Sequence, residues 1–134
     1  MRVAAKPDLY SPDGEEPALR GTRCGACGRV CFPPLTIGCD ACGGTENQLE
    51  PVALATAGEV HSIATVHRHR GEPAAPFVVA DIRLDDGPLI RAMVAAGAGG
   101  ELRIGDRVQG AWQVLRVDDD GNDVVEPAFT RAER

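Results

Sequence analysis

The chain has 134 residues, of which 43% are hydrophobic and only 4% aromatic, and its formal net charge is −6. This length suits one compact domain, or a small module beside a larger one, with a core built mainly from Val, Leu, Ile and Ala. The negative net charge argues against a nucleic-acid-binding protein that contacts phosphate backbones through a broad basic face.

The first 17 residues are rich in proline, glycine and charge, which predicts an extended arm and leaves disorder of its first ten residues open. They contain no apolar stretch typical of a secretory signal, and no run in the chain approaches the ~20 apolar residues of a membrane span. We therefore expect a soluble protein of the cytoplasm, where cysteines favour metal ligation over disulfides.

The next segment, residues 18–50, holds all five cysteines. Four of them form a Cys-x2-Cys-x11-Cys-x2-Cys pattern, made by Cys24, Cys27, Cys39 and Cys42. Two residues between thiolates let a tight turn direct both sulfurs at one ion, and the glycine after each pair permits the positive φ that closes the turn. The pattern predicts a closed, structural Zn²⁺ site with four sulfurs, although iron in a rubredoxin-like site uses the same ligands.

The fifth cysteine, Cys31, fits neither pair. A reactive thiolate needs a cationic or histidine partner, and Arg29 is the one such residue close to Cys31 in the sequence. We therefore interpret Cys31 as a small, half-buried residue without a chemical role. The stiff apolar corner that follows, Phe32-Pro33-Pro34, either staples the loop between the two cysteine pairs or is an exposed docking element.

From residue 51 to residue 134 the sequence changes to short β-rich segments separated by turns. Strands are predicted within 52–69, 76–84, 88–95, 107–117 and 124–129, with turn signals at "DDG" and "DDDGND". About five strands in ~80 residues, without a long amphipathic helix, indicate a small barrel such as the OB-fold. The predicted fold class is mainly β: an N-terminal rubredoxin-like zinc ribbon followed by a five-stranded OB-fold barrel.

Two histidines and two arginines lie at the end of the first of these β-rich segments, in "HRHRGEP" at residues 67–73. One interpretation is a site for an anionic group such as a nucleotide phosphate. The alternative is a solvated loop, because charged residues at strand ends are ordinary. The single tryptophan, Trp112, is expected at the core or its edge, with contact to a partner as the alternative.

With these residues placed, the chain resembles a known family. These are the zinc-ribbon/OB-fold proteins, long known only as a domain of unknown function, that accompany thiolases and thiolase-like lipid-transfer-protein enzymes. The resemblance runs through the ribbon with its Phe-Pro-Pro, and through "LEPVALATAGEVHSIATVH", which resembles a strand pair broken by a glycine. It continues in "PFVVADIRLDDG" and "LRIGDRV", and it covers residues 18–129.

The resemblance implies a non-catalytic accessory subunit that binds a thiolase-like partner, often as a heterotetramer around a partner dimer. The partner carries the nucleophile and makes or breaks carbon–carbon bonds in acyl-CoA thioesters. One branch of the family serves retro-aldol cleavage of steroid side-chain CoA esters, and the short arm suggests this branch or an excised domain. We expect Arg68, His69 and Arg70 to contact acyl-CoA phosphate, and the Phe32, Pro33 and Pro34 corner to face the partner.

The residues by themselves present no Ser-His-Asp, Cys-His or paired-carboxylate pattern, which leaves a binding or assembly role. A single-stranded nucleic-acid-binding protein is one alternative, because OB-fold barrels serve that purpose. The net charge of −6 and the scarcity of aromatics count against it. A rubredoxin-like redox carrier is the second alternative. We expect neither nucleic acid nor a membrane as a partner.

Overall fold

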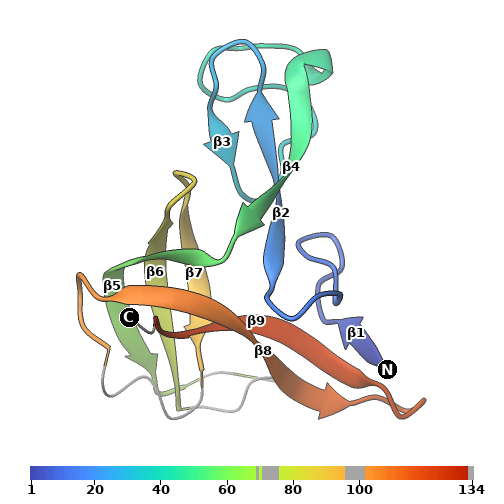
Figure 1. Ribbon diagram of the computed structural model, residues 1–134, viewed down its shortest axis with the longest axis vertical. Coiled ribbons are helices and arrows are strands. Elements are labelled where there is room, and N and C mark those ends of the chain that lie inside the picture. The colour runs from blue at the N-terminus through green and yellow to red at the C-terminus, as the bar shows by residue number, and fades with distance from the viewer. Residues whose placement is uncertain (69, 71–75, 96–101, 133–134) are drawn as a thin grey trace.

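The computed structural model describes residues 1–68, 70, 76–95 and 102–132, which form strands in two sheets and one 3-10 turn. A small ribbon lobe stands on one end of a larger barrel (Figure 1). In chain order the elements are β1 (Arg2–Ala4), β2 (Ala18–Cys24), β3 (Val30–Cys31), η1 (Glu46–Gln48), β4 (Leu49–Ala55), β5 (Ala57–Val66), β6 (Phe77–Leu84), β7 (Leu89–Val94), β8 (Arg107–Val117) and β9 (Asp123–Arg131). Among the described residues, no helix is long and apolar enough to cross a membrane.

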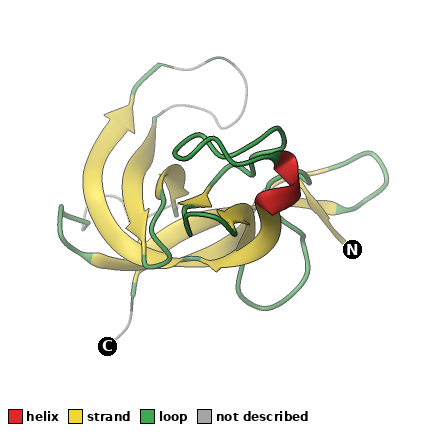
Figure 2. Cartoon of the chain, turned by 90° about the horizontal axis from the view of Figure 1, so that it is seen from above, coloured by secondary structure: helices red, strands yellow, loops and turns green. Residues whose placement is uncertain are grey.

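Five of these strands close into the predicted barrel. They pair in the order β5-β6-β7-β9-β8, and β8 returns to β5 to complete the ring. Figure 2 shows these strands curling around one another. The inward faces fill the interior with mostly aliphatic side chains, and those at most 1% exposed include Val60, Ile82, Leu84, Val108, Val125 and Phe129. The mainly β fold class with a five-stranded barrel is confirmed.

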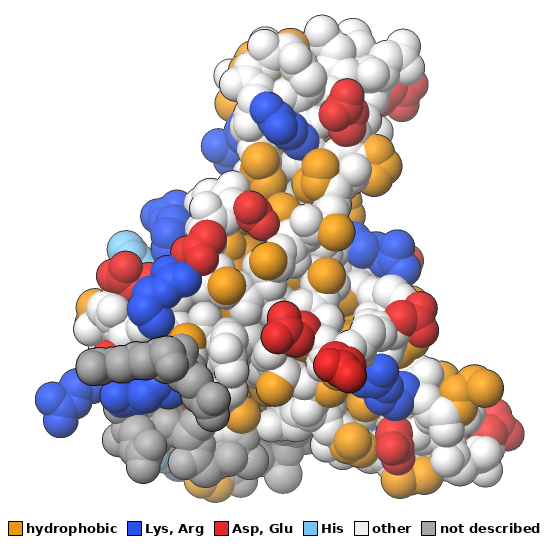
Figure 3. Space-filling view, viewed as in Figure 1, with side chains coloured by type: hydrophobic (Ala, Val, Ile, Leu, Met, Phe, Trp, Pro, Cys, Tyr) orange, Lys and Arg blue, Asp and Glu red, His pale blue; other side chains and the backbone are white. Residues whose placement is uncertain are grey.

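A two-strand stem made of β2 and β4 connects the ribbon to the barrel. β4 pairs with β2 along its whole length, from Leu49 to Ala55, so the sheet of the ribbon continues past residue 50. Strand alternation turns Leu19 and Leu54 of the stem inward, where both are buried in the same cluster as the barrel core. Hydrophobic side chains also gather on the surface over this stem (Figure 3). The division of the chain at residue 50 stays a prediction.

The stem meets the barrel at Thr56, between β4 and β5. Thr56 is buried, and its hydroxyl donates a hydrogen bond to the carbonyl oxygen of Pro17 at 2.8 Å. Its side chain lies so close to Gly110 of β8 that a Cβ at that position would collide with it. The chain therefore changes sheet at Thr56. Gly58, at the break suggested by the family resemblance, lies inside β5, where its backbone runs close to the carbonyl group of Arg83.

The N-terminal arm is fastened to the barrel rather than disordered. β1 pairs in parallel with β9, and Tyr10 is buried with its hydroxyl donating to the carbonyl oxygen of Val125 at 3.0 Å. The ring centroids of Tyr10 and Trp112 lie 5.9 Å apart, and the indole N–H of Trp112 donates to the carbonyl oxygen of Gly14 at 2.9 Å. Trp112 is therefore at the edge of the core, where it holds the arm.

Candidate metal centre and its surroundings

The four cysteines of the two pairs come together at the far end of the ribbon. Their sulfur atoms all lie within 4.8 Å of one another. The Sγ atoms of Cys24 and Cys42 are 3.7 Å apart, and those of Cys27 and Cys39 are 3.6 Å apart. A tetrahedral ion with Zn–S bonds of about 2.3 Å needs sulfurs about 3.8 Å apart. The four side chains therefore fit a single ion of this kind, and the structure brings together the ligand set that the spacing predicts.

Each cysteine pair lies on a tight turn closed by the glycine that follows it. The amide of Gly28 donates to the carbonyl oxygen of Cys24 at 2.7 Å, and the amide of Gly43 donates to that of Cys39 at 3.1 Å. These glycines have φ values of +81° and +75°, and open space surrounds the position that a Cβ would take. Glycine is needed here for its backbone conformation rather than for its small size.

Backbone amides and neighbouring thiols shift the protonation of this cluster in opposite directions. The amides of Cys42 and Ala41 lower the pKa of Cys39 to about 7. The amide of Gly44 also lowers the pKa of Cys42, but the three neighbouring thiols outweigh it and raise that pKa to about 12. Four thiols at this spacing cannot all ionise without a cation among them, and a divalent ion supplies that charge.

Cys31 lies outside the cluster, at the end of β3, and only 8% of it is exposed. The Nε of Arg29 donates to its sulfur at 3.2 Å, and the same nitrogen lies 2.7 Å from a carboxylate oxygen of Asp40. Arg29 thus ties the first cysteine turn to the second through Asp40, a residue that sequence reasoning missed. The interpretation of Cys31 as a residue without chemistry stays a prediction, although its expected cationic neighbour does contact it.

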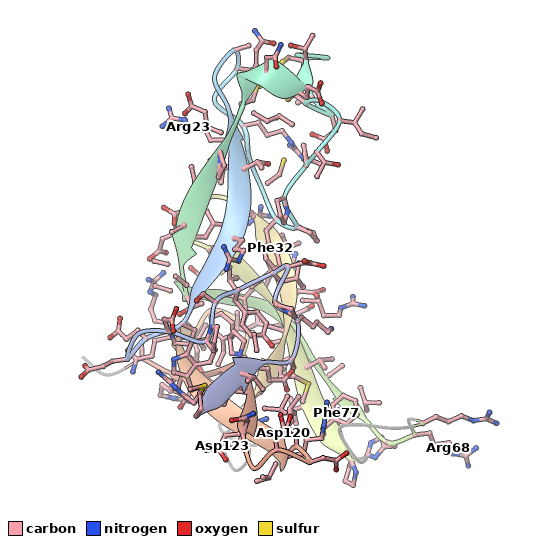
Figure 4. All side chains as sticks on the ribbon, turned by 90° about the vertical axis from the view of Figure 1, so that its right-hand side faces the viewer. Arg23, Phe32, Arg68, Phe77, Asp120 and Asp123 are labelled. Atoms are coloured by element: carbon pink, nitrogen blue, oxygen red, sulfur yellow. The ribbon has the colours of Figure 1, made fainter. Side chains whose placement is uncertain are left out.

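The corner formed by Phe32, Pro33 and Pro34 does not present one continuous surface. Phe32 is half-buried and packs against the barrel core, between ribbon and barrel (Figure 4). Pro33 is exposed, and Pro34 lines a groove on another side of the stem. Both alternatives for this corner, a staple of the loop between the cysteine pairs and an interface with a partner, stay predictions.

The residues predicted to contact phosphate lie elsewhere. Arg68 and Arg70 follow β5 and are exposed, and His69 lies outside the described residues. Figure 4 shows Arg68 extending from the barrel, well away from Phe32. The described residues therefore do not bring this group together with the metal centre or with the Phe-Pro-Pro corner. The contact of Arg68, His69 and Arg70 with acyl-CoA stays a prediction.

A cavity of about 130 Å³ lies where arm, ribbon and barrel meet, with Tyr10 and Phe32 in its walls. Glu126 of β9 also lines it, and its buried Oε1 atom has no hydrogen-bond partner among the described residues. Burial raises the pKa of this carboxyl, and the charge of Lys6 offsets part of that effect. Sequence reasoning missed Glu126 because strand alternation does not show which polar residues face a cavity.

The fold and the four-cysteine centre together define a protein that joins a metal-binding ribbon to an OB-fold barrel. Two family models match the chain: the rubredoxin-like zinc ribbon domain of ChsH2 at residues 13–48 and the C-terminal OB-fold domain of ChsH2 at residues 51–113. A DUF35 domain-containing scaffold protein of Methanocaldococcus jannaschii is 32% identical over 113 residues, which cover 83% of this chain and 77% of that protein. The chain therefore belongs to the DUF35 family of zinc-ribbon/OB-fold proteins, which confirms the resemblance seen in the sequence.

Two further similarities involve named enzyme complexes. The benzoylsuccinyl-CoA thiolase subunit BbsA of Thauera aromatica is 31% identical over 127 residues, which cover 93% of this chain and 85% of that protein. Among solved structures, a chain of the Ltp2-ChsH2(DUF35) aldolase superposes with a TM-score of 0.66 and 26% identity. That match covers 85% of this chain and 84% of the other.

Proposed function

We propose that this chain is a non-catalytic accessory subunit that binds and supports a thiolase-like enzyme acting on acyl-CoA thioesters. One observation carries the proposal: over most of its length the chain is similar both to a thiolase subunit and to a chain of an aldolase complex. The DUF35 relatives named as scaffold proteins support a role in assembly. A four-cysteine shell also has no open coordination position, which suits a structural ion better than a catalytic one.

The reaction class follows from what the two complexes share. A thiolase and an aldolase both make or break a carbon–carbon bond, so we propose such a reaction for the partner of this chain. Retro-aldol cleavage of a steroid side-chain CoA ester is the more specific form that we propose, and the likeness to the Ltp2-ChsH2(DUF35) aldolase supports the aldolase part of it. The likeness to BbsA supports the thiolase form. A heterotetramer around a partner dimer, in the cytoplasm, completes the proposal.

Zn²⁺ is the ion we propose for the ribbon. The sulfur spacing supports a tetrahedral four-sulfur ion, and the description of the matching ribbon model as a zinc ribbon supports zinc. The ion holds together a lobe that has little core of its own, because β3 has only two residues and the 3-10 turn none that are buried. Arg68, His69 and Arg70 are proposed to contact the phosphates of acyl-CoA, and the exposure of both arginines supports this.

The test is isolation of the tagged chain from its native cells under mild conditions, with mass spectrometry of the proteins that co-purify. We expect a thiolase-fold enzyme in stoichiometric amount, and cleavage or formation of a carbon–carbon bond in an acyl-CoA only when that enzyme is present. Turnover of acyl-CoA by the isolated chain, at the rate of the complex, would contradict the proposal. Salt-dependent binding of single-stranded DNA would favour the nucleic-acid alternative, and a coloured iron centre would favour the redox carrier.

A further inference from the structure

A groove of about 540 Å³ runs along the stem between the ribbon and the barrel. Its floor is the outward face of β2 and β4, where alternation places Ala18 and Arg20 beside Pro51 and Ala53. These four residues are exposed, whereas Leu19 and Leu54 on the opposite face of the stem are buried in the core. Small side chains on an exposed strand face leave a shallow hollow because they rise little above the backbone.

The wall of the groove comes from the loop after the Phe-Pro-Pro corner. Pro34, Leu35 and Thr36 line it, and the amide of Leu35 donates to the hydroxyl oxygen of Thr22 at 3.1 Å. Thr22 is a buried residue of β2. This hydrogen bond holds the loop beside the strand, so the groove has a fixed wall in the structure of the free chain. A preformed apolar hollow of this kind suits a binding surface, because little ordering is needed when a partner docks.

Arg20 is the charged residue of this groove. None of the other residues that line it is acidic or basic. Within the described part of the chain, Arg20 forms no ion pair, whereas arginines such as Arg29, Arg91 and Arg107 each pair with an aspartate. An unpaired guanidinium above an apolar floor favours a ligand that combines apolar side chains with a carboxylate.

The free edge of β4 indicates how such a ligand would lie. The amide of Ala55 points away from β2, because it donates a hydrogen bond to the carboxylate of Asp86 at 3.3 Å. Main-chain N–H and C=O groups alternate in direction along a strand, so those of the other odd-numbered residues of β4 also point away from β2. Pro51 is one of these residues, but it has no N–H group to donate. Between Pro51 and Ala55, the amide of Ala53 is therefore the free donor on this edge of β4. An edge blocked at both ends is poorly suited to the addition of a strand. Recognition must therefore come from side chains that enter the groove.

We propose that this groove is the docking surface for the thiolase-like partner, and that it receives an apolar helix or loop of that partner whose carboxylate pairs with Arg20. The inference rests on the proposed function, since it names the surface through which the complex forms. It also gives Pro34 a role that differs from that of Phe32: Pro34 forms the wall of the groove, while Phe32 holds the ribbon on the barrel.

The experiment measures the affinity between the purified chain and the thiolase-like enzyme identified in its native complex, by isothermal titration calorimetry at two salt concentrations. Arg20→Glu reverses the charge in the groove, and Ala53→Phe fills the floor. Arg103→Glu is the matched control, because Arg103 is exposed on the barrel and does not line the groove. Circular dichroism and metal content check that every variant folds.

We expect both groove variants to weaken binding at least about tenfold and the control to stay within about twofold. Added salt should weaken binding of the wild type but strengthen binding of Arg20→Glu, because salt screens the repulsion between the new carboxylate and that of the partner. If the Arg20→Glu variant binds with wild-type affinity, the proposal that this groove is the docking surface is refuted, whereas the proposed accessory function is not. If the wild-type chain captures no thiolase-like enzyme from its cells, the proposed function fails, and the groove proposal fails with it.

Discussion

Replacing Cys27 by serine should release the bound metal ion, whereas replacing Cys31 by serine should not. Cys27 lies on the first cysteine turn and Cys31 lies four positions later, at the end of β3, which makes one a control for the other. The sulfur of Cys27 is 3.6 Å from that of Cys39, within the cluster of four. Cys31 is not in the cluster, and its sulfur contacts Arg29 instead.

The size of the effect follows from the closed shell. Structural zinc sites with four ligands bind with apparent free energies of about 10–16 kcal/mol near pH 7. If the four thiolates contribute comparably, losing one costs about 3 kcal/mol, or more than about a hundredfold in affinity. The ribbon should then lose its order locally, because its residues beyond the stem bury little besides the cysteines, whereas the barrel has a core of its own.

The assay is metal content by mass spectrometry after dialysis against a chelator of moderate affinity, combined with hydrogen exchange of backbone amides. Wild-type protein and Cys31→Ser should retain about one zinc per chain. Cys27→Ser should retain almost none, and the amide of Gly43 in the second turn should exchange faster while the amides of the barrel do not. Full metal retention by Cys27→Ser, or metal loss from Cys31→Ser alone, would refute the assignment of the ligands.

Substitutions at three further positions test the cavity, the arm and the first cysteine turn. Burial raises the pKa of Glu126, so the folded chain binds the carboxyl proton more tightly than the unfolded chain does. The free energy of unfolding should therefore fall as the pH rises above the ordinary carboxyl range. Glu126→Gln should therefore raise the free energy of unfolding at pH 7 but not below about pH 4, as urea titrations at both pH values can show. Trp112→Leu removes the hydrogen bond to Gly14 and should speed amide exchange in the arm, with unchanged metal content; protection equal to wild type would contradict this role. Gly28→Ala should cost about 1 kcal/mol because φ is positive there, and Gly28→Asn should cost less; equal stability of all three proteins in urea would argue against strain in this turn.

Local patterns in the sequence predict the five strands of the barrel, but not β1, β2 or β3. The segment 107–117 was predicted as one strand, and β8 has these bounds because polar turns stop it at both ends. What the sequence could not show was the sheet to which a strand belongs. Residues 52–69 read as one β-rich segment, but β4 pairs with β2 and β5 pairs with β6 and β8. The pairing of β1 with β9 joins opposite ends of the chain, and no local pattern records it.

The same distinction explains which parts of the site were predictable. The metal ligands form two short pairs, so their spacing alone predicts the cluster that the structure brings together. The groove along the stem is assembled from the arm, from both strands of the stem and from the loop after Phe32, and its residues are unremarkable in each segment. Only the pairing of β2 with β4 places Arg20 beside Ala53. The local spacing of ligands in a sequence can therefore predict a metal site, whereas a docking surface can be identified only once the pairing of the strands is known. For this reason the sequence drew attention to Phe32, the bulky residue of its corner, and passed over the small residues that line the open surface.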